Sequence, residues 1–559
     1  MRSELDRRMD ATMARVTGPD GPLPLTQVAR HGVTLPAFAV APPSLAHYFA
    51  HYGQAHRDTC FLVAGEERLT FGEVYGVAAG IARSLVARGI GRGDRVGIAA
   101  RNSPVWIATY MGVLMAGGVA TLLNGWWKAE ELASALGDVG CALVVADGPR
   151  ADRLAAIEGL AVPVVRVDDR LPLPQAAAPL MGGEGVLPEL GPDDAATILF
   201  TSGSTGRSKG ALADHGSVLQ ATLNFLAQAL MVLGLSTEDG TAPTLPPATM
   251  LTLPLFHITA MVPVLLQSFA MGRKLVLLPK WDAREAMRLI EREQVTYFVG
   301  VPLMSYEILN HPDRAAFDLS TVTDFAAGGA PRPAEHVRRM DAELGGSAPL
   351  IGYGLTETNA AGTANWRSNY LAKPDSAGRA SAPLIELAIL DDAGRPVPQG
   401  ERGEVAIRSI ANFREYWNNP AATAAAITAD GFFRTGDIGY LDADDYLFIV
   451  DRKKDIIIRG GENISCLEVE AALYAHPAVR EAAVFGLADD RLGEVPAAVV
   501  HAEAGVEAAA LQAFLGEHIA AFKVPARLWL VDAPLPRLGT EKIDKVALRA
   551  TYRALAAGG

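Results

Sequence analysis

Residues 201–210 combine residue types that can hold the phosphates of a nucleotide. The run Thr-Ser-Gly-Ser-Thr-Gly-Arg-Ser-Lys-Gly follows an apolar, strand-like stretch at residues 196–200. Glycines let backbone N–H groups turn toward anionic oxygens, hydroxyls donate further hydrogen bonds, and Lys209 supplies a positive charge. The run is not a Walker A loop, because two residues separate Gly206 from Lys209. Taken alone, it fits a flexible Gly/Ser loop equally well.

Further clusters of glycine, hydroxyl and charged residues follow at residues 327–331, 352–358, 433–437 with 451–455, and 536–543. Taken singly, the candidate residues in them have ordinary explanations. Tyr353 fits a packed aromatic, Glu357 a solvated acid, Asp437 a turn residue and Lys542 an exposed lysine. Only their joint order in one chain favours a functional role over these ordinary explanations.

The segments between these clusters alternate between apolar β-rich runs and amphipathic helices. Strands are expected at residues 94–99, 142–146, 274–278 and 295–299, and a helix at 283–293 with Asp282 as its N-cap. This alternation predicts an α/β fold, a large N-terminal domain with parallel-rich sheets flanked by helices. Residues 1–40 are predicted to be an extended lead-in, and residues 171–191 a surface connection.

The last hundred residues predict a small α+β domain. Helices are expected at 467–474 and 507–521, with strands at 479–487 and 495–501 between them. The charged run Asp-Arg-Lys-Lys at 451–454 is unsuited to a core and marks a boundary. We therefore divide the chain into a large domain, residues 1–450, and a small mobile domain, residues 451–559.

Composition excludes several classes of function. The chain has 559 residues, a net charge of −13 and three cysteines, Cys60, Cys141 and Cys466, without metal or disulfide spacing. The acidic balance argues against nucleic-acid binding.

Two uncharged stretches, 104–127 and 248–272, are long enough to span a bilayer. Glycine, proline and polar residues interrupt them, so we expect buried elements of the fold instead.

The chain termini and the charge bear on where the protein works. The first residues lack the apolar segment of a secretory signal, and the last residues carry no lipidation signal. We therefore expect a cytoplasmic protein without a transmembrane segment. Peripheral membrane contact stays open, as does the choice between monomer and homodimer.

With these motifs in order, roughly residues 60–550 strongly resemble the adenylate-forming superfamily of acyl-CoA synthetases, peptide-synthetase adenylation domains and firefly-type luciferases. The greatest likeness is to fatty-acyl-CoA ligases. Such enzymes join a carboxylate to the α-phosphate of ATP, release pyrophosphate, and pass the acyl group to a thiol. The resemblance implies ATP, Mg²⁺, coenzyme A and a small carboxylic acid as cofactors and substrates. An anion attacks a polyanion in the first step, so the site must neutralise charge.

The resemblance also implies which residues bind the nucleotide. The 201–210 loop would hold the β- and γ-phosphates, Tyr353 would stack on adenine, and Asp437 would accept hydrogen bonds from the ribose. The implied set is Thr201, Ser202, Gly203, Ser204, Thr205, Gly206, Lys209, Gly328, Gly329, Ala330, Tyr353, Asp437 and Arg452.

Four residues are implied to be catalytic. Glu357 would hold Mg²⁺, which suits one carboxylate plus phosphate oxygens, and Thr205 is a second candidate ligand. Thr356 would hydrogen-bond a phosphate, and Lys542 would bridge the carboxylate and the α-phosphate. His257 would lie near the carboxylate, although a histidine buried for packing is the alternative.

The position of Lys542 in the small domain implies a domain movement. It reaches the nucleotide only if the small domain closes over the large one. In the family this domain then rotates about a hinge, which matches Lys454 here. After rotation, Gly460 and Gly461 would face the site and leave room for the pantetheine arm of CoA.

Residues 253–261, Leu-Pro-Leu-Phe-His-Ile-Thr-Ala-Met, match the family motif that opens the acid pocket. Residues 248–272 contain no acidic residue, whereas amino-acid-activating relatives place an aspartate here to pair with the substrate ammonium. The neighbouring residues are apolar. We therefore expect a hydrophobic acid, with a medium or long aliphatic chain ahead of an aryl acid.

Other functions stay open at this point. CoA is the favoured acceptor, because the small domain is complete and no carrier segment follows Lys542. An acyl-adenylate synthetase could instead load a carrier protein in trans. A ligand-binding protein without turnover is disfavoured, because the charged motif residues are all retained, and luciferase-like oxygenation is also disfavoured.

Overall fold

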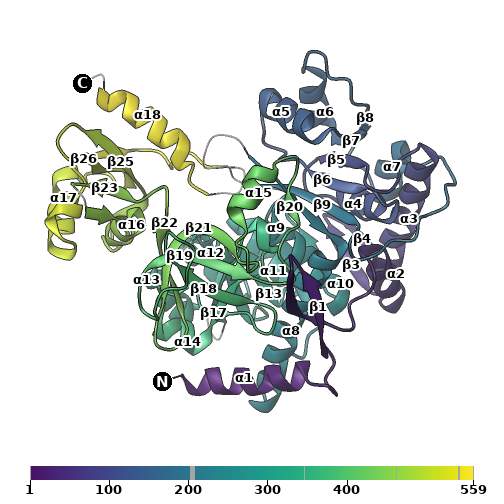
Figure 1. The fold of residues 1–559 in the computed structure, drawn as a ribbon, viewed down its shortest axis with the longest axis horizontal. Coiled ribbons are helices and arrows are strands. Elements are labelled where there is room, and N and C mark those ends of the chain that lie inside the picture. Colours follow the sequence, from purple (N-terminus) through teal and green to yellow (C-terminus); the bar gives the residue numbers. More distant parts are fainter. Residues whose placement is uncertain are drawn as a thin grey trace.

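Two large sheets with helices on their faces form the body of the chain (Figure 1). The computed structural model describes residues 2–201, 208–330, 332–344, 347–460, 462–538 and 542–557. A seven-stranded sheet has the order β20-β10-β9-β6-β5-β7-β8, and the pairs from β9 to β8 are parallel. Its strands are β5 (Arg95–Ala99), β6 (Val119–Leu122), β7 (Leu143–Asp147), β8 (Val164–Val167), β9 (Ala195–Phe200), β10 (Gly210–Asp214) and β20 (Glu415–Tyr416).

A nine-stranded sheet lies beside it, in the order β17-β16-β15-β14-β13-β11-β12-β3-β4. The pairs from β15 to β3 are parallel, so the predicted α/β class with parallel-rich sheets is confirmed. Its strands are β3 (Cys60–Ala64), β4 (Glu67–Thr70), β11 (Ala248–Leu251), β12 (Lys274–Leu277), β13 (Tyr297–Gly300), β14 (Asp324–Gly328), β15 (Ala348–Tyr353), β16 (Thr363–Trp366) and β17 (Arg379–Ala380).

Local sequence sets the helices that cover these sheets. Asp282 caps α11 as predicted, because its side chain accepts a hydrogen bond from the Glu285 N–H at 2.8 Å. Ser103 caps α4, where Pro104 occupies the first turn. The helices are α2 (Leu45–Ala55), α3 (Phe71–Ala87), α4 (Pro104–Met115), α5 (Ala129–Val139), α6 (Gly148–Ala155), α8 (His215–Glu238), α9 (Ile258–Ala260), α10 (Gln267–Met271), α11 (Ala283–Glu293), α12 (Pro302–Asn310), α13 (Ala334–Glu343) and α14 (Arg367–Ala372).

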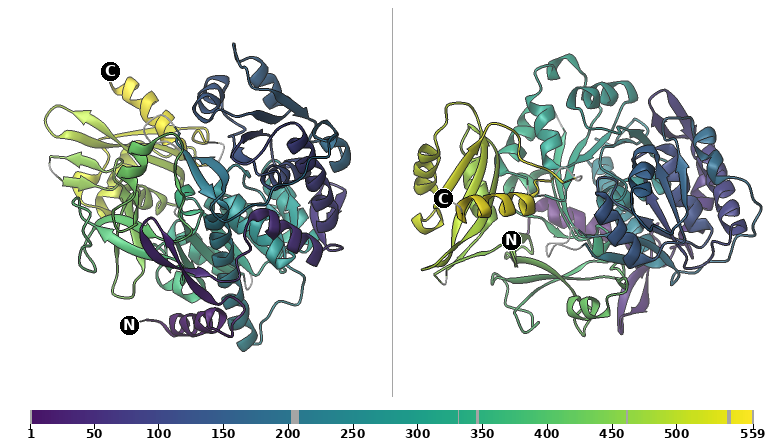
Figure 2. Two further views of the ribbon diagram at one scale, coloured as in Figure 1. Left: turned by 45° about the vertical axis from the view of Figure 1, so that its right-hand side comes forward. Right: turned by 90° about the horizontal axis from the view of Figure 1, so that it is seen from above.

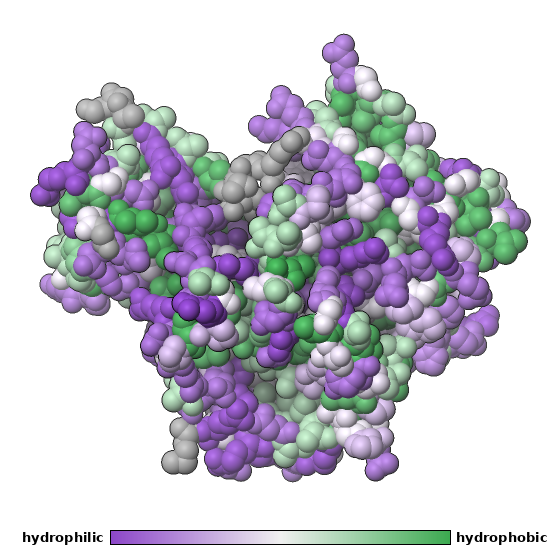
Figure 3. All heavy atoms as spheres, in the orientation of Figure 1, coloured by the Kyte–Doolittle hydropathy of each residue, from purple (hydrophilic) through white to green (hydrophobic). Residues whose placement is uncertain are grey.

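A four-stranded antiparallel sheet continues the large domain toward the small one. It contains β18 (Glu386–Leu390), β19 (Gly403–Arg408), β21 (Phe433–Leu441) and β22 (Leu447–Arg452), and α15 (Pro420–Ala426) precedes β21. The small domain lies at one side of this body (Figure 2). The space-filling view shows a notch between the small domain and the lobe that carries α5 and α6 (Figure 3).

The small domain has its own sheet and core, as its sequence predicted. Strands β23 (Ile457–Arg459), β24 (Glu462–Ile464), β25 (Val479–Asp489), β26 (Gly493–Ala502) and β27 (Arg527–Val531) are covered by α16 (Cys466–Tyr474), α17 (Ala508–His518) and α18 (Lys545–Ala557). Side chains such as Val469, Val484 and Leu511 are buried together between them. Arg452 ends β22 in the large domain's sheet, and Ile457 begins β23. The chain therefore changes sheets within residues 453–456, which include Lys454.

The prediction of an extended lead-in over residues 1–40 is wrong. Helix α1 (Glu4–Thr17) is followed by a hairpin of β1 (Leu25–Arg30) and β2 (Val33–Phe38). A capping box starts α1, because Ser3 and Asp6 each bond the other's backbone N–H. Asp6 also accepts a hydrogen bond from the Tyr446 hydroxyl at 3.0 Å. The helix is thereby fixed to the β21–β22 hairpin.

The prediction of a surface connection at residues 171–191 is wrong for its first half. Helix α7 (Leu173–Ala177) and a 3₁₀ turn, Ala178–Leu180, lie there. Leu173 and Leu180 are buried in the main core, because apolar side chains in this short segment face α3 and α4.

The two uncharged stretches are buried elements, as expected. The first forms α4, in which every residue is buried, and β6. The second forms β11, α9, a π-helix at Met261–Leu266 and α10. Among the helices in the described residues, α8 is long and apolar enough to cross a membrane. It packs against α1, and 56% of its most apolar window is buried.

Candidate active site

Three predicted site segments begin at the same edge of the nine-stranded sheet. In parallel sheets, loops at the carboxyl ends of strands form the usual ligand site. His257 follows β11, Gly329 follows β14, and Tyr353 ends β15. Gly328 and Gly352 are paired in register, so the glycine pair and Tyr353 lie side by side.

Tyr353, Asp437 and Arg452 form one continuous chain of polar contacts. The Tyr353 hydroxyl donates to Asp437 Oδ2 at 2.6 Å, and Arg452 Nε lies 3.0 Å from Asp437 Oδ1. Antiparallel pairing of β21 and β22 places Asp437 opposite Arg452. Burial and the Asp437 carboxylate raise the pKa of Tyr353 well above its usual value, so the hydroxyl stays a donor. The predicted adenine and ribose residues are thus brought together.

Glu357 lies in a 3₁₀ turn, Thr356–Thr358, directly after β15 and is 7% exposed. Its Oε1 accepts a hydrogen bond from the Tyr416 hydroxyl at 2.6 Å, and its backbone oxygen accepts from the Phe413 N–H at 2.7 Å. Burial raises the pKa of the Glu357 carboxyl, opposed by the Tyr416 hydrogen bond and by the charges of Arg452 and Lys209. This carboxylate is therefore held in a fixed, largely dry position.

Tyr416 is a site residue that the sequence analysis missed. Its ring lies under the Lys209 ammonium, with Nζ 4.7 Å from the ring centroid. Tyr416 lies outside the recognised motifs, in a short strand without a glycine cluster to mark it. Only the pairing of β20 with β10 brings it beside Lys209.

Thr201 and Lys209, on either side of the predicted phosphate-binding residues, are hydrogen-bonded to each other. The Thr201 N–H donates to the Lys209 carbonyl at 2.9 Å, and the Lys209 N–H reaches Thr201 Oγ1 at 3.4 Å. The predicted loop residues Ser202, Gly203, Ser204, Thr205 and Gly206 lie outside the described residues, as does Gly461.

Lys542 lies against the large domain. A Cβ atom built on Gly329 would be 3.0 Å from Lys542 Cε and 3.2 Å from Nζ, and Gly329 has a φ of +77°. The positive φ favours glycine at this position, and the absence of a side chain leaves room for the Lys542 side chain beside it. Burial and the Arg452 charge lower the pKa of Lys542 to about 8, with Asp437 opposing them. The small domain is therefore closed in this structure, in the arrangement expected for adenylation.

His257 is a buried, neutral imidazole within range of the Lys542 charge. Burial, with the Lys542 charge as a smaller cause, lowers the pKa of His257 to about 3. Its Nε2 is buried and has no hydrogen-bond partner among the described residues. A polar atom in that position is suited to a polar ligand group, because an unmet hydrogen bond is costly in a dry site.

Gly460 lies away from this arrangement. Its N–H donates to the Leu492 carbonyl at 2.7 Å, and a Cβ there would lie 3.3 Å from Leu492 Cδ2. Both contacts are within the small domain. The facing of Gly460 toward the site after rotation stays a prediction.

Lys453 lies at the change of sheets and is bonded to the large domain. Its Nζ lies 2.8 Å from Asp392 Oδ1, and its backbone N–H donates to the Gly436 carbonyl at 2.8 Å.

The described residues fit Mg²⁺ as a cation shared with phosphates. No group of three or more His, Cys, Asp or Glu side chains able to hold a metal occurs in the described part of the chain. Mg²⁺ commonly binds one or two carboxylates and takes its remaining ligands from phosphates and water. Glu357 offers one such carboxylate, buried near Lys209, which is the donor set expected at a nucleotide-phosphate site.

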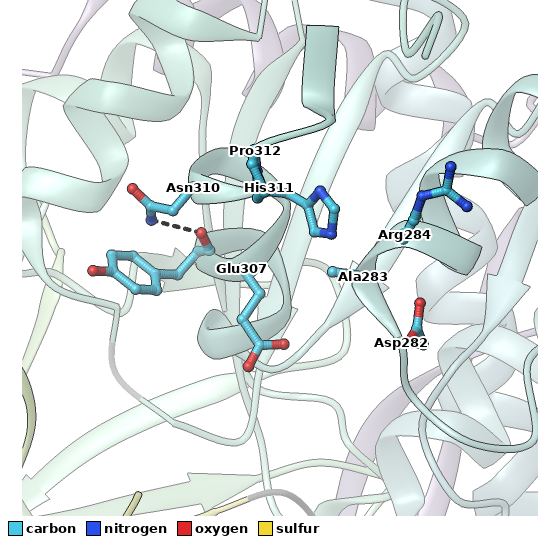
Figure 4. A pocket seen from close by; sticks show the side chains of 8 residues that line it. Asp282, Ala283, Arg284, Glu307, Asn310, His311 and Pro312 are labelled. Carbon is cyan, nitrogen blue, oxygen red and sulfur yellow. Dashed lines mark hydrogen bonds between the residues drawn. The ribbon is translucent and has the colours of Figure 1, made fainter. Parts of the chain in front are cut away.

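Two surface pockets lie apart from these residues. One, of about 330 Å³, is lined by Asp282, Ala283, Arg284, Tyr306, Glu307, Asn310, His311 and Pro312 (Figure 4). The other, of about 320 Å³, lies beside α5 and includes Leu136, Cys141 and Ile157. Neither contains a predicted site residue, so neither enters the chemistry below.

Comparison with known proteins decides the family. The AMP-binding enzyme family matches residues 49–417, and the AMP-binding enzyme C-terminal domain matches residues 468–542. The chain belongs to the AMP-binding enzyme family. The predicted membership of the adenylate-forming superfamily is therefore confirmed.

Similar proteins extend over nearly the whole chain. A feruloyl-CoA synthase of Amycolatopsis sp is 34% identical over 87% of this chain and 95% of its own length. A long-chain-fatty-acid–CoA ligase of Mycobacterium tuberculosis is 34% identical over 87% and 94%. An O-succinylbenzoate coenzyme A synthetase from Bacillus subtilis, solved with ATP and magnesium ion, has a TM-score of 0.77 at 26% identity, covering 91% of this chain and 99% of its own.

These findings confirm the predicted enzyme class and cofactors. This AMP-binding enzyme is an AMP-forming acid–CoA ligase that uses ATP, Mg²⁺ and CoA. The roles of individual site residues stay predictions, which the contacts above make specific enough to test.

The pKa of Lys542 predicts a pH limit on adenylation. Lys542 must be charged to bridge two anions, and its pKa of about 8 lies below the usual lysine value. We expect kcat/KM for pyrophosphate release, which reports the free enzyme, to fall as pH rises through about 8. Lys542→Arg, which keeps its charge, should lack this limb in whatever activity it retains. A flat wild-type profile from about pH 7 to about pH 9 would contradict the assignment.

Proposed function

We propose that this ligase activates a hydrophobic carboxylic acid, with a medium or long aliphatic chain ahead of an aryl acid. The observation that carries the proposal is the buried apolar segment that follows His257. In the π-helix Met261–Leu266, five of six side chains are buried, namely Met261, Val262, Val264, Leu265 and Leu266. A substrate ammonium placed there would lack a counter-charge, whereas each buried methylene would gain roughly 0.8 kcal/mol.

Backbone carbonyls of this apolar segment accept hydrogen bonds from a buried arginine, Arg273. A π-helix has irregular hydrogen bonding, and the Arg273 guanidinium donates to two of its backbone carbonyls. Its Nη2 lies 2.9 Å from both the Pro263 and Val264 carbonyls, and its Nε donates to Ser268 Oγ at 2.9 Å. Arg273 is 3% exposed, and burial lowers its pKa to about 10. The Arg273 guanidinium is therefore engaged by groups within the protein and is not offered to a substrate. This supports an apolar acid pocket.

The chemistry follows from the charges at the closed site. A carboxylate oxygen attacks the α-phosphorus of ATP, and the bond from that phosphorus to the bridging oxygen breaks to release pyrophosphate. Lys542 would hold both anions together from its position beside Gly329, while the neutral His257 contributes no charge of its own. Bound Mg²⁺ would supply positive charge to the phosphate oxygens. Thiolysis then needs Lys542 to withdraw, which the sheet change at residues 453–456 would permit.

The relatives are named for several classes of acid, among them fatty acids and aryl acids. Proteins named for long-chain fatty acids and for ferulate are equally similar to this chain. The aryl acid is therefore the second candidate, and pocket depth would decide between them.

An acid panel tests the proposal. Pyrophosphate release is measured with MgATP across saturated fatty acids from short to long and across aryl acids, with and without CoA. We expect CoA-dependent turnover to peak at one aliphatic length, with kcat/KM rising by up to about fourfold per methylene before the peak. Higher kcat/KM for an aryl acid would favour the second candidate. Adenylate without thioester would indicate a carrier protein, and no pyrophosphate from any acid would contradict both proposals.

A further inference from the structure

The segment at residues 413–417 connects the phosphate loop to Glu357. On one side, the Phe413 N–H donates to the Glu357 carbonyl at 2.7 Å. On the other, the Trp417 N–H donates to the Gly210 carbonyl at 2.8 Å, and Tyr416 pairs with Ala211. Gly210 and Ala211 begin the strand that leaves the phosphate loop. The segment is thus tied by its backbone to both halves of the predicted MgATP site.

The Tyr416 side chain lies between two opposite charges. Its hydroxyl donates to Glu357 Oε1 at 2.6 Å, and its ring face lies 4.7 Å from Lys209 Nζ. In the part of the chain that the structure describes, no ion pair of 4 Å or less joins Lys209 to Glu357. Tyr416 is 6% exposed and packs edge-on against Phe413 with ring centroids 4.8 Å apart. The ring therefore has little freedom to move out of this position.

Separation of these charges has a functional consequence. In a dry site, an ammonium and a carboxylate attract strongly, and a direct pair would satisfy both before any ligand arrived. The ring instead offers Lys209 a weaker cation–π contact, and the hydroxyl offers Glu357 a single hydrogen bond. Each charge keeps capacity for a partner of its own: phosphate oxygens for Lys209 and Mg²⁺ for Glu357.

We propose that Tyr416 is a positioning residue that holds Lys209 and Glu357 apart and oriented, so that ATP and Mg²⁺ bind as one unit. The proposal rests on Glu357 as the magnesium ligand. The hydroxyl acts on the metal side of the site, and the ring acts on the phosphate side. These two parts of one side chain are separable by substitution.

Calorimetric binding of ATP tests the proposal without turnover. The full-length enzyme is titrated with ATP in excess Mg²⁺ and with ATP in excess chelator, and the ratio of the two affinities is compared among variants. We expect Tyr416→Phe to lower the preference for MgATP by about tenfold while leaving metal-free ATP affinity unchanged, because one hydrogen bond to a charged group is lost. Tyr416→Leu should weaken metal-free ATP as well.

Tyr446→Phe is the matched control. It also removes a buried hydroxyl that donates to a carboxylate, that of Asp6, at 3.0 Å. We expect its MgATP preference to equal that of the wild type. If Tyr416→Phe also has the wild-type ratio of MgATP affinity to metal-free ATP affinity, the positioning role is overturned. Because the substitution removes only one hydroxyl, that result would not be confused with misfolding.

A double variant separates positioning from general damage. If Tyr416 acts through Glu357, adding Tyr416→Phe to Glu357→Gln should cause no further loss of MgATP preference. Additive losses would overturn the proposal. If Glu357→Gln alone leaves the preference unchanged, the metal assignment fails, and the proposal fails with it for a different and recognisable reason.

Discussion

Lys542→Ala should abolish acyl-adenylate formation while sparing the thioester step. The ammonium lies beside Gly329 and near His257, where the carboxylate and the α-phosphate are expected to meet. Loss of one such preorganised charge costs on the order of 100- to 1,000-fold in rate. The second half-reaction is expected to proceed after the small domain has rotated Lys542 away. The measurement is pyrophosphate release from acid and MgATP, beside thioester formation from supplied acyl-AMP and CoA.

Arg480→Ala is the control for this variant. Arg480 is an exposed cation of the small domain, 3.8 Å from Glu503, and belongs to no predicted site. Its removal should leave both half-reactions unchanged, because exposed ion pairs contribute little. Equal loss of both half-reactions in Lys542→Ala would contradict domain rotation, even if adenylation were abolished.

Glu357→Gln should impair the magnesium dependence of adenylation. Gln keeps the size of the side chain and an oxygen that accepts the Tyr416 hydrogen bond, so the change isolates the negative charge. Since loss of a supporting group around a metal already costs 10- to 100-fold in affinity, we expect the half-saturating Mg²⁺ concentration to rise by on the order of 100-fold. Pyrophosphate release across a Mg²⁺ titration at saturating ATP measures this.

Glu335→Gln provides the matched control for the charge. Glu335 is an exposed acid on α13, 3.3 Å from Arg338, and should leave the titration unchanged. If Glu357→Gln followed the wild-type Mg²⁺ curve, the metal would have to be held elsewhere. The Lys542 prediction would survive that result, because it depends on a different element.

Local signals in the sequence predicted much of the secondary structure. Residues Ala283–Glu293 form a helix with Asp282 as its cap, because capping and the apolar period act within a few residues. A signal of the same kind occurs at the N-terminus, where Ser3 and Asp6 form the capping box that starts α1. The glycines and prolines of residues 1–40 favour an extended chain instead, and the prediction based on them is wrong.

Contacts between distant residues could not be predicted in the same way. Tyr416 reaches Glu357 and Lys209 only because β20 pairs with β10 and the backbone of Phe413 is bonded to Glu357. No pattern at Tyr416 itself reports those partners. The pairing of Tyr353 with Asp437 likewise depends on the packing of two different sheets.

Residue types and motif order were enough to predict a phosphate-binding loop, an acidic metal candidate and two domains. These follow from residue types and short spacings, which act locally along the chain. The tertiary structure decided that Lys542 meets Gly329 across the domain junction, that His257 is buried and neutral, and that Tyr416 separates Lys209 from Glu357. Those outcomes depend on burial and on distances between elements far apart in the chain, which residue order alone does not fix.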